Sequence, residues 1–147
     1  MKKIFLVLAT LATLMVSNSA LAAFTLNGGT NDYRLTDCSL LANDIDIVLT
    51  SNVIGGVQCD TANNFIALSV CHTSGLVTER SAVVLDTNGD GTQDCTVTET
   101  EDCVQTVSGA QFPTATTANG TVTSQYPQQT CNATNVEGNA DAQTAPQ

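Results

Sequence analysis

The sequence predicts a mainly β protein, built as a small disulfide-stabilised antiparallel sandwich or barrel-like sheet with a flexible polar C-terminal segment. Three observations support this fold class. Residues 23–147 contain 21 Thr, 11 Asn, 9 Gln and 7 Ser, and no window has the sustained apolar period of a helix. Short runs rich in Val, Ile and Thr alternate with Gly and Asn turn signals, which is typical of closely spaced strands. All six cysteines follow residue 22.

The first 22 residues have the order of a secretory signal peptide. Lys2 and Lys3 form a short basic region of bacterial type, an apolar region runs from Ile4 to Val16, and Ala20-Leu21-Ala22 matches an A-x-A cleavage site. We therefore expect a secreted, extracellular protein, with the periplasm as the alternative. No later apolar stretch reaches 18 residues, so no membrane association is expected after cleavage of the signal.

The strands expected in the mature chain are mostly short and follow one another closely. A strand over 44–50 is indicated by Ile45, Ile47 and Leu49, which fall on one face. The run from Phe65 to Cys71 is the most apolar of the mature chain, which predicts a central strand. The other expected strands are 24–26, 53–57, 81–85, 96–98 and 103–107.

Two local features interrupt this pattern of strands. Gly55-Gly56 indicates a bulge or tight turn within the 53–57 strand. Asp37 or Ser39 is a candidate cap for a single helical turn over residues 40–42.

Composition divides the mature chain at residue 109. Residues 23–108 are expected to form the β-rich disulfide-linked domain, and 109–147 a Thr/Asn/Gln-rich extension. From residue 109 onward only Phe112, Val122 and Val136 are Val, Ile, Leu or Phe, and all three prolines lie there. Such a segment buries too little apolar area to offset its ordering entropy. If Cys131 is paired it ties the extension to the domain, which leaves a free tail from about residue 132.

An even number of cysteines in an exported chain favours three disulfides. The six are Cys38, Cys59, Cys71, Cys95, Cys103 and Cys131, and they allow 15 pairings. Sequential pairing (38–59, 71–95 and 103–131) would close three loops of similar length, and a 59–71 bond would instead link the ends of one hairpin. A zinc site is disfavoured because there is no C-x-x-C pair and only one histidine.

One stretch has the spacing of a metal-binding loop. Oxygen-bearing side chains occupy loop positions 1, 3, 5 and 9, position 6 is a glycine, and position 7 can offer its backbone carbonyl. The candidate ligands are Asp86, Asn88, Asp90, Thr92 and Asp94. Calcium binds six to eight hard oxygen ligands, and alternate residues of a tightly turning loop can direct them inward.

The nine residues 86–94 resemble the D-x-[DN]-x-D-G-x-x-D calcium loop of EF-hands, dockerins, thrombospondin type 3 repeats and integrin-type repeats. The resemblance implies a calcium site and says nothing about the rest of the chain. An EF-hand would place a glutamate at position 12, where this chain has Val97, and the flanks are strand-like. The expected role is a structural clip that binds calcium weakly. The alternative is a plain hairpin turn, since Asn-Gly and Asp-Gly favour such turns.

Charge and residue content narrow the possible functions. Residues 23–147 hold 14 acidic side chains and two arginines, a net charge of 2 − 14 = −12, which argues against nucleic-acid partners. His72 is the lone histidine and no G-x-S-x-G motif exists, so no catalytic residues are assigned and the protein is not expected to be an enzyme.

Export, disulfides and a Thr-rich sheet favour a non-enzymatic structural or adhesive protein, such as a fibre, matrix or cell-surface subunit. Its expected partners are copies of itself, paired by strand addition, or a cell surface. The alternative is a monomeric secreted or periplasmic module that binds calcium or another ligand. A small secreted enzyme or inhibitor ranks third.

Overall fold

The computed structural model describes residues 22–84 and 103–143. It confirms the mainly β, antiparallel fold, with one helix, α1 (Ala133–Asp141). The strands are β1 (Ala22–Leu26), β2 (Gly29–Tyr33), β3 (Ile45–Leu49), β4 (Val53–Asp60), β5 (Phe65–His72), β6 (Arg80–Val83), β7 (Val104–Val107), β8 (Phe112–Thr116) and β9 (Val122–Gln125).

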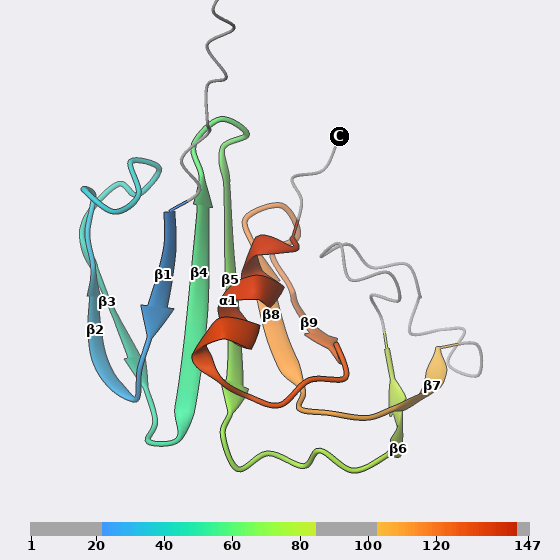
Figure 1. Cartoon of the computed structure of the whole chain (residues 1–147). Helices are drawn as coiled ribbons and strands as arrows, with labels where there is room; N and C mark the ends of the chain where they lie inside the picture. Colours follow the sequence, from blue (N-terminus) through green and yellow to red (C-terminus); the bar gives the residue numbers. More distant parts are fainter. Residues whose placement is uncertain (1–21, 85–102, 144–147) are drawn as a thin grey trace, which may run out of the picture.

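Five strands form the central sheet, in the order β1-β4-β5-β8-β9, and every neighbouring pair is antiparallel. The β2–β3 and β6–β7 pairs form two separate ribbons. In Figure 1, α1 lies across the middle of the sheet, the β2–β3 ribbon lies beyond β1, and the β6–β7 ribbon lies on the β9 side. The central sheet is open, with β1 and β9 at its edges, so the layered arrangement fits better than a closed barrel.

One face of the sheet, the hairpin face, packs against the β2–β3 ribbon and the loop between its strands. Tyr33 and Cys38 form a buried cluster there with Leu26, Val57 and Cys59. The Cys38–Cys59 disulfide joins the loop to β4. This bond and the apolar cluster together hold a ribbon that two strands alone would not stabilise.

The opposite face, the helix face, is covered by α1. Val136 and Ala140 are fully buried against it, and the Cys71–Cys131 disulfide links β5 to the residue before the helix N-cap, Asn132. Gly56 allows this close approach, because an added Cβ would lie 2.7 Å from the helix backbone. A nine-residue helix is too short to be stable alone, so these contacts sustain it.

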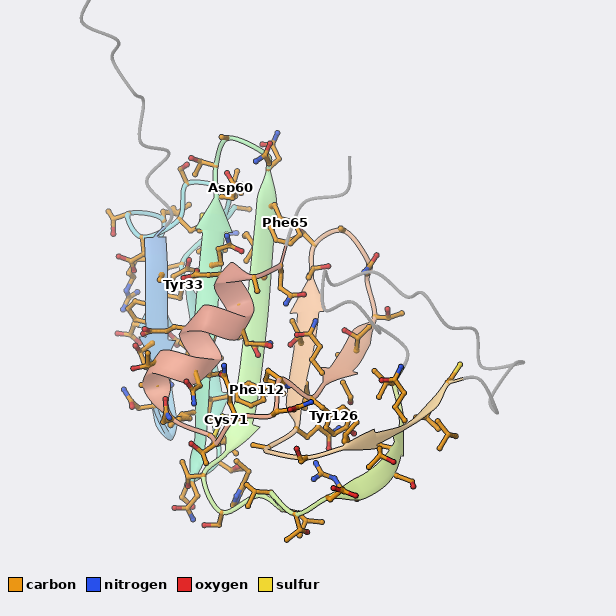
Figure 2. All side chains as sticks on the ribbon, turned by 45° about the vertical axis from the view of Figure 1, so that its right-hand side comes forward. Tyr33, Asp60, Phe65, Cys71, Phe112 and Tyr126 are labelled. Carbon is orange, nitrogen blue, oxygen red and sulfur yellow. A yellow bond between two sulfur atoms is a disulfide. The ribbon has the colours of Figure 1, made fainter. Side chains whose placement is uncertain are left out.

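Much of the layer between α1 and the sheet is polar and hydrogen-bonded. The Asn139 amide donates to Ser69 Oγ at 2.9 Å and to Thr114 Oγ1 at 3.1 Å. The Gln125 and Gln143 side chains donate to each other at 3.0 and 3.1 Å. Figure 2 shows α1 lying over the central strands of the sheet. Buried polar groups are tolerated here because they bond to one another.

The predicted strands over 24–26, 44–50, 65–71, 81–85 and 103–107 are confirmed with shifted ends. Two local predictions are wrong. Gly55 and Gly56 lie inside the continuous strand β4, where the second glycine accommodates the helix, and residues 40–42 form turns and bends without a helix. Strand β2 was not predicted, because its sequence GTNDY is mostly polar. The predicted strand over 96–98 lies outside the described residues.

The expectation of a flexible extension is wrong for the described part of residues 109–147. Strands β8 and β9 belong to the central sheet, and α1 occupies the region expected to be a free tail. The composition argument failed because these residues bury hydrogen-bonded Thr and Gln side chains as well as apolar ones. Cys131 does tie this segment to the rest of the fold, as expected.

The disulfide pairing agrees only in part with the sequential scheme. The 38–59 bond is present, whereas Cys71 bonds to Cys131, which excludes the 71–95, 103–131 and 59–71 pairs. Cys71 faces α1, so the partner it meets is the cysteine at the start of the helix. Cys103 is also disulfide-bonded, and none of the described cysteines is free.

Candidate functional site

A cleft lies on the hairpin face of the central sheet, near the end of the β5–β8 ladder. The paired residues are Ala67–Thr116, Leu68–Ala115 and Ser69–Thr114. Beyond the other end of this ladder, the Thr117 amide donates to the Ile66 carbonyl at 2.9 Å. Hydrogen-bonded pairs alternate along antiparallel strands, so this bond sets the positions of the others.

In that register Val70 would form the next hydrogen-bonded pair with Pro113. Proline has no amide hydrogen, so the Val70 carbonyl has no donor at that position. The two strands are not paired beyond Ser69 and Thr114, and the sequence at residue 113 supplies the reason.

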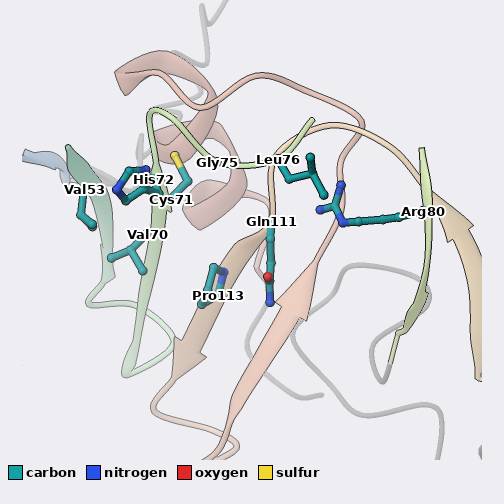
Figure 3. Close-up of a pocket in the computed structure, with 9 residues that line it drawn as sticks. All are labelled: Val53, Val70, Cys71, His72, Gly75, Leu76, Arg80, Gln111 and Pro113. Carbon is teal, nitrogen blue, oxygen red and sulfur yellow. The ribbon is translucent and has the colours of Figure 1, made fainter. Parts of the chain in front are cut away.

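The cleft lies beside this position, over the side chains of β4, β5 and β8. Its volume is about 420 Å³, within the range of small-molecule sites. None of the described residues that line it is acidic. They are Val53, Val70, Cys71, His72, Gly75, Leu76, Arg80, Gln111 and Pro113. Figure 3 shows Arg80 reaching in from one side, with His72 and Val53 on the opposite side and Pro113 between them.

The Arg80 guanidinium is held in place at the cleft. Its Nη1 donates to the Thr78 carbonyl at 3.0 Å and to the Gly109 carbonyl at 3.1 Å. Its central carbon lies 5.2 Å from the centre of the Tyr126 ring, a cation–π distance. Gly109 can occupy this place only without a side chain, since its φ is +78° and an added Cβ would lie 2.6 Å from the Gln129 nitrogen.

The two arginines of the chain, Arg34 and Arg80, have different surroundings. Arg34 forms ion pairs with Asp32 at 2.6 Å and Asp44 at 3.3 Å. The Leu35 amide, followed by this guanidinium, lowers the pKa of Asp44 below its ordinary value. Arg80 has no such carboxylate partner within residues 22–84 and 103–143. Its Nη2 and Nε groups also form no hydrogen bond with these residues.

Two further polar side chains line the cleft. The Ser74 amide donates to His72 Nδ1 at 3.1 Å, so a neutral imidazole carries its hydrogen on Nε2. Gln111 Nε2 donates to Ser124 Oγ at 2.6 Å, and this bond orients the amide. Together with Arg80, the histidine provides the cleft with hydrogen-bond donors beside apolar walls.

The second candidate surface is the outer edge of β9. No described strand pairs with it. Phe112–Gln125 and Thr114–Thr123 fall at the hydrogen-bonding positions towards β8, so the backbone groups of Val122 and Ser124 point to the open edge. The strand has no charged residue, and Val122 is 65% exposed. Natural edge strands usually carry charges, prolines or bulges that prevent pairing with another chain.

The residues predicted to bind calcium, Asp86 to Asp94, lie outside the described residues. Strands β6 and β7 pair on either side of this segment, from Arg80–Val107 to Val83–Val104, and the Val84 amide donates to the Cys103 carbonyl at 2.9 Å. In the described part of the chain, no group of three His, Cys, Asp or Glu side chains is arranged to hold a metal.

The sequence did not predict this cleft, and His72, considered only as a lone histidine, is the last residue of β5. The available signal was Pro113, because a proline marks a position where a ladder can end. Within residues 22–84 and 103–143, no helix combines the length and apolarity that a membrane crossing requires. Comparisons of the chain with protein-family models, curated proteins and solved structures found no match.

Proposed function

We propose that this protein is a secreted, non-enzymatic structural or adhesive subunit that associates with copies of itself by strand addition at the β9 edge. The observation that carries the proposal is that edge: four uncharged residues, unpaired by any described strand, with outward backbone groups. Strand addition uses such backbone groups for affinity and the exposed side chains for specificity.

The surface next to this edge supports the same proposal. Val122 lies on the hairpin face, opposite α1, where Pro113 and Ala115 of β8 are only partly buried. The disulfides and the signal peptide expected at residues 1–22 fit export to an oxidising compartment.

We propose further that the loop from Asp86 to Asp94 binds calcium as a clip that stabilises the β6–β7 ribbon. The strands on both sides of the loop support a β-flanked clip rather than an EF-hand switch. At 5 mM calcium, a dissociation constant of about 10⁻⁴ to 10⁻³ M would add about 1–2 kcal/mol to the free energy of unfolding.

Sedimentation velocity and electron microscopy of the oxidised mature protein test self-association. We expect concentration-dependent oligomers or filaments. The Val122→Lys variant should weaken them by placing a charge at the edge, and Ser124→Pro should remove one outward amide. The matched control is Val48→Lys, since Val48 is also an exposed strand valine, at 71%.

A strictly monomeric protein at all concentrations, with and without calcium, would count against the self-association proposal. Equal effects of Val122→Lys and Val48→Lys would remove β9 as the contact. The calcium clip is tested separately by thermal unfolding with calcium or magnesium. Asp90→Ala should abolish a calcium-specific increase in melting temperature, and no increase in the parent protein would refute the clip.

A further inference from the structure

We propose that the cleft near the end of the β5–β8 ladder is a binding site for a monocarboxylate with a short apolar body. Arg80 binds the carboxylate, and the side chains of Val53, Leu76 and Pro113 contact the apolar part. This inference goes beyond the proposed structural role and does not depend on it, because it is argued from the lining of the cleft and not from the open edge of β9.

The charge of the ligand follows from the state of Arg80. Residues 23–147 contain two cationic side chains besides 14 acids, and Arg34 already pairs with two of those acids. Arg80 instead lines a cleft whose described lining residues include no acid, and no described carboxylate pairs with it. A carboxylate bound in the cleft would supply the anionic partner that the described residues do not provide.

The geometry of Arg80 favours a carboxylate. Nη1 donates to the Thr78 and Gly109 carbonyls at 3.0 and 3.1 Å. These two bonds and the contact with the Tyr126 ring fix the plane of the guanidinium. The Nε–Nη2 edge remains, and two parallel N–H groups of this kind bind both oxygens of one carboxylate. Because the side chain is already held, little further conformational entropy is lost on binding.

The remaining lining defines the body of the ligand. The apolar walls of the cleft are Val53, Val70, Leu76 and Pro113, and Leu76 is 60% exposed. A volume of about 420 Å³ suits a short aliphatic or single-ring body. His72, from the opposite side, can donate through Nε2 to a polar atom on the ligand.

The net negative charge of the protein does not exclude an anionic ligand. At physiological ionic strength, charges separated by more than about 8 Å of solvent are largely screened. The local guanidinium then outweighs the distant carboxylates. We therefore expect affinity to fall on lowering the salt concentration, because repulsion from the rest of the surface is then less screened.

The test is a titration of the ¹⁵N-labelled mature protein followed by ¹H–¹⁵N correlation spectra. Sodium hexanoate is the probe and hexanamide its neutral counterpart. We expect hexanoate to shift the amides of Val70, His72 and Gly75 saturably, with millimolar affinity, and hexanamide to bind at least tenfold more weakly. An N-acetylated Ala-Leu dipeptide acid, compared with its amide, shows whether a peptide terminus is the better carboxylate source.

Arg80→Gln should weaken hexanoate binding at least tenfold, whereas Arg34→Gln should leave it unchanged. If Arg80→Gln does not fold, Leu76→Trp tests the site instead. The tryptophan should block hexanoate binding by filling the cleft from an exposed position, while the guanidinium stays intact. Equal shifts with hexanoate and hexanamide, undiminished binding by Arg80→Gln or Leu76→Trp, or no saturable shift at 50 mM would overturn the proposal.

Discussion

Replacing Gly56 with alanine places a methyl group directly beneath α1. The new Cβ would lie 2.7 Å from Glu137 Cα and 2.8 Å from the Val136 carbonyl oxygen. Both are helix backbone atoms, so no side-chain rotation relieves the contact. To restore an ordinary separation of 3.4 Å, the helix must move away from the sheet by about 3.4 − 2.7 = 0.7 Å.

That displacement separates surfaces that are now fully buried. Val136 and Ala140 lose contact with the sheet, and the hydrogen bonds from Asn139 to Ser69 and Thr114 lengthen. Overpacking of this kind costs up to about 3 kcal/mol. Alanine is preferred over glycine within a strand by up to about 1 kcal/mol, which offsets part of the loss. We therefore expect the free energy of unfolding to fall by about 2 kcal/mol.

Urea unfolding of the oxidised mature protein, followed by circular dichroism, measures this change. Gly138→Ala is the matched control, because it is the same substitution within α1 and an added Cβ there meets nothing within 4 Å. It should stabilise the protein by up to about 1 kcal/mol through helix propensity. The close packing of α1 on β4 would be refuted if Gly56→Ala were as stable as the parent protein.

Three further predictions concern crosslinking, pH and a buried hydroxyl. Replacing Cys71 and Cys131 by alanine opens a loop of 60 residues and should lower the free energy of unfolding by about 4 kcal/mol. Guanidinium titrations measure this change, and a decrease of less than about 1 kcal/mol would contradict the prediction. The pKa of Asp44 lies below its ordinary 3.8, so its stabilising contribution is present above that pH and is lost as the pH falls through the folded-state pKa. Asp44→Asn should therefore flatten the acid side of a stability–pH curve measured from pH 2.5 to 7, and parallel curves would contradict this. Tyr33→Phe should raise the free energy of unfolding by about 1 kcal/mol in urea, because the buried hydroxyl has no partner among the described residues, and a decrease would show that it is satisfied.

The fold class and several strands could be predicted because they depend on local pattern. The alternation from Ile45 to Leu49 and the apolar run from Phe65 to Cys71 both correspond to strands. The Cys38–Cys59 bond belongs to the sequential scheme, but the sequence alone could not select it among the 15 pairings. The predicted calcium ligands lie outside the described residues and stay a prediction.

The C-terminal part could not be predicted because its order depends on partners distant in the sequence. Thr114 belongs to a strand because it pairs with Ser69 and Thr123, and Asn139, 25 residues later, hydrogen-bonds its buried side chain. Gln125 is buried because Gln143 pairs with it. The sequence prediction relied on apolar content, which does not reveal polar side chains that are buried with their hydrogen bonds satisfied.

By itself, the sequence determined the antiparallel β class, the excess of negative charge and the number of cysteines, since these follow from composition and local periodicity. The tertiary structure alone decided which face of β5 meets α1, and hence that Cys71 pairs with Cys131. It also decided that Pro113 lies opposite Val70 at the end of the β5–β8 ladder, and that Arg80 and His72 line one cleft. Both outcomes depend on strand register, which is set by contacts between residues far apart in the chain.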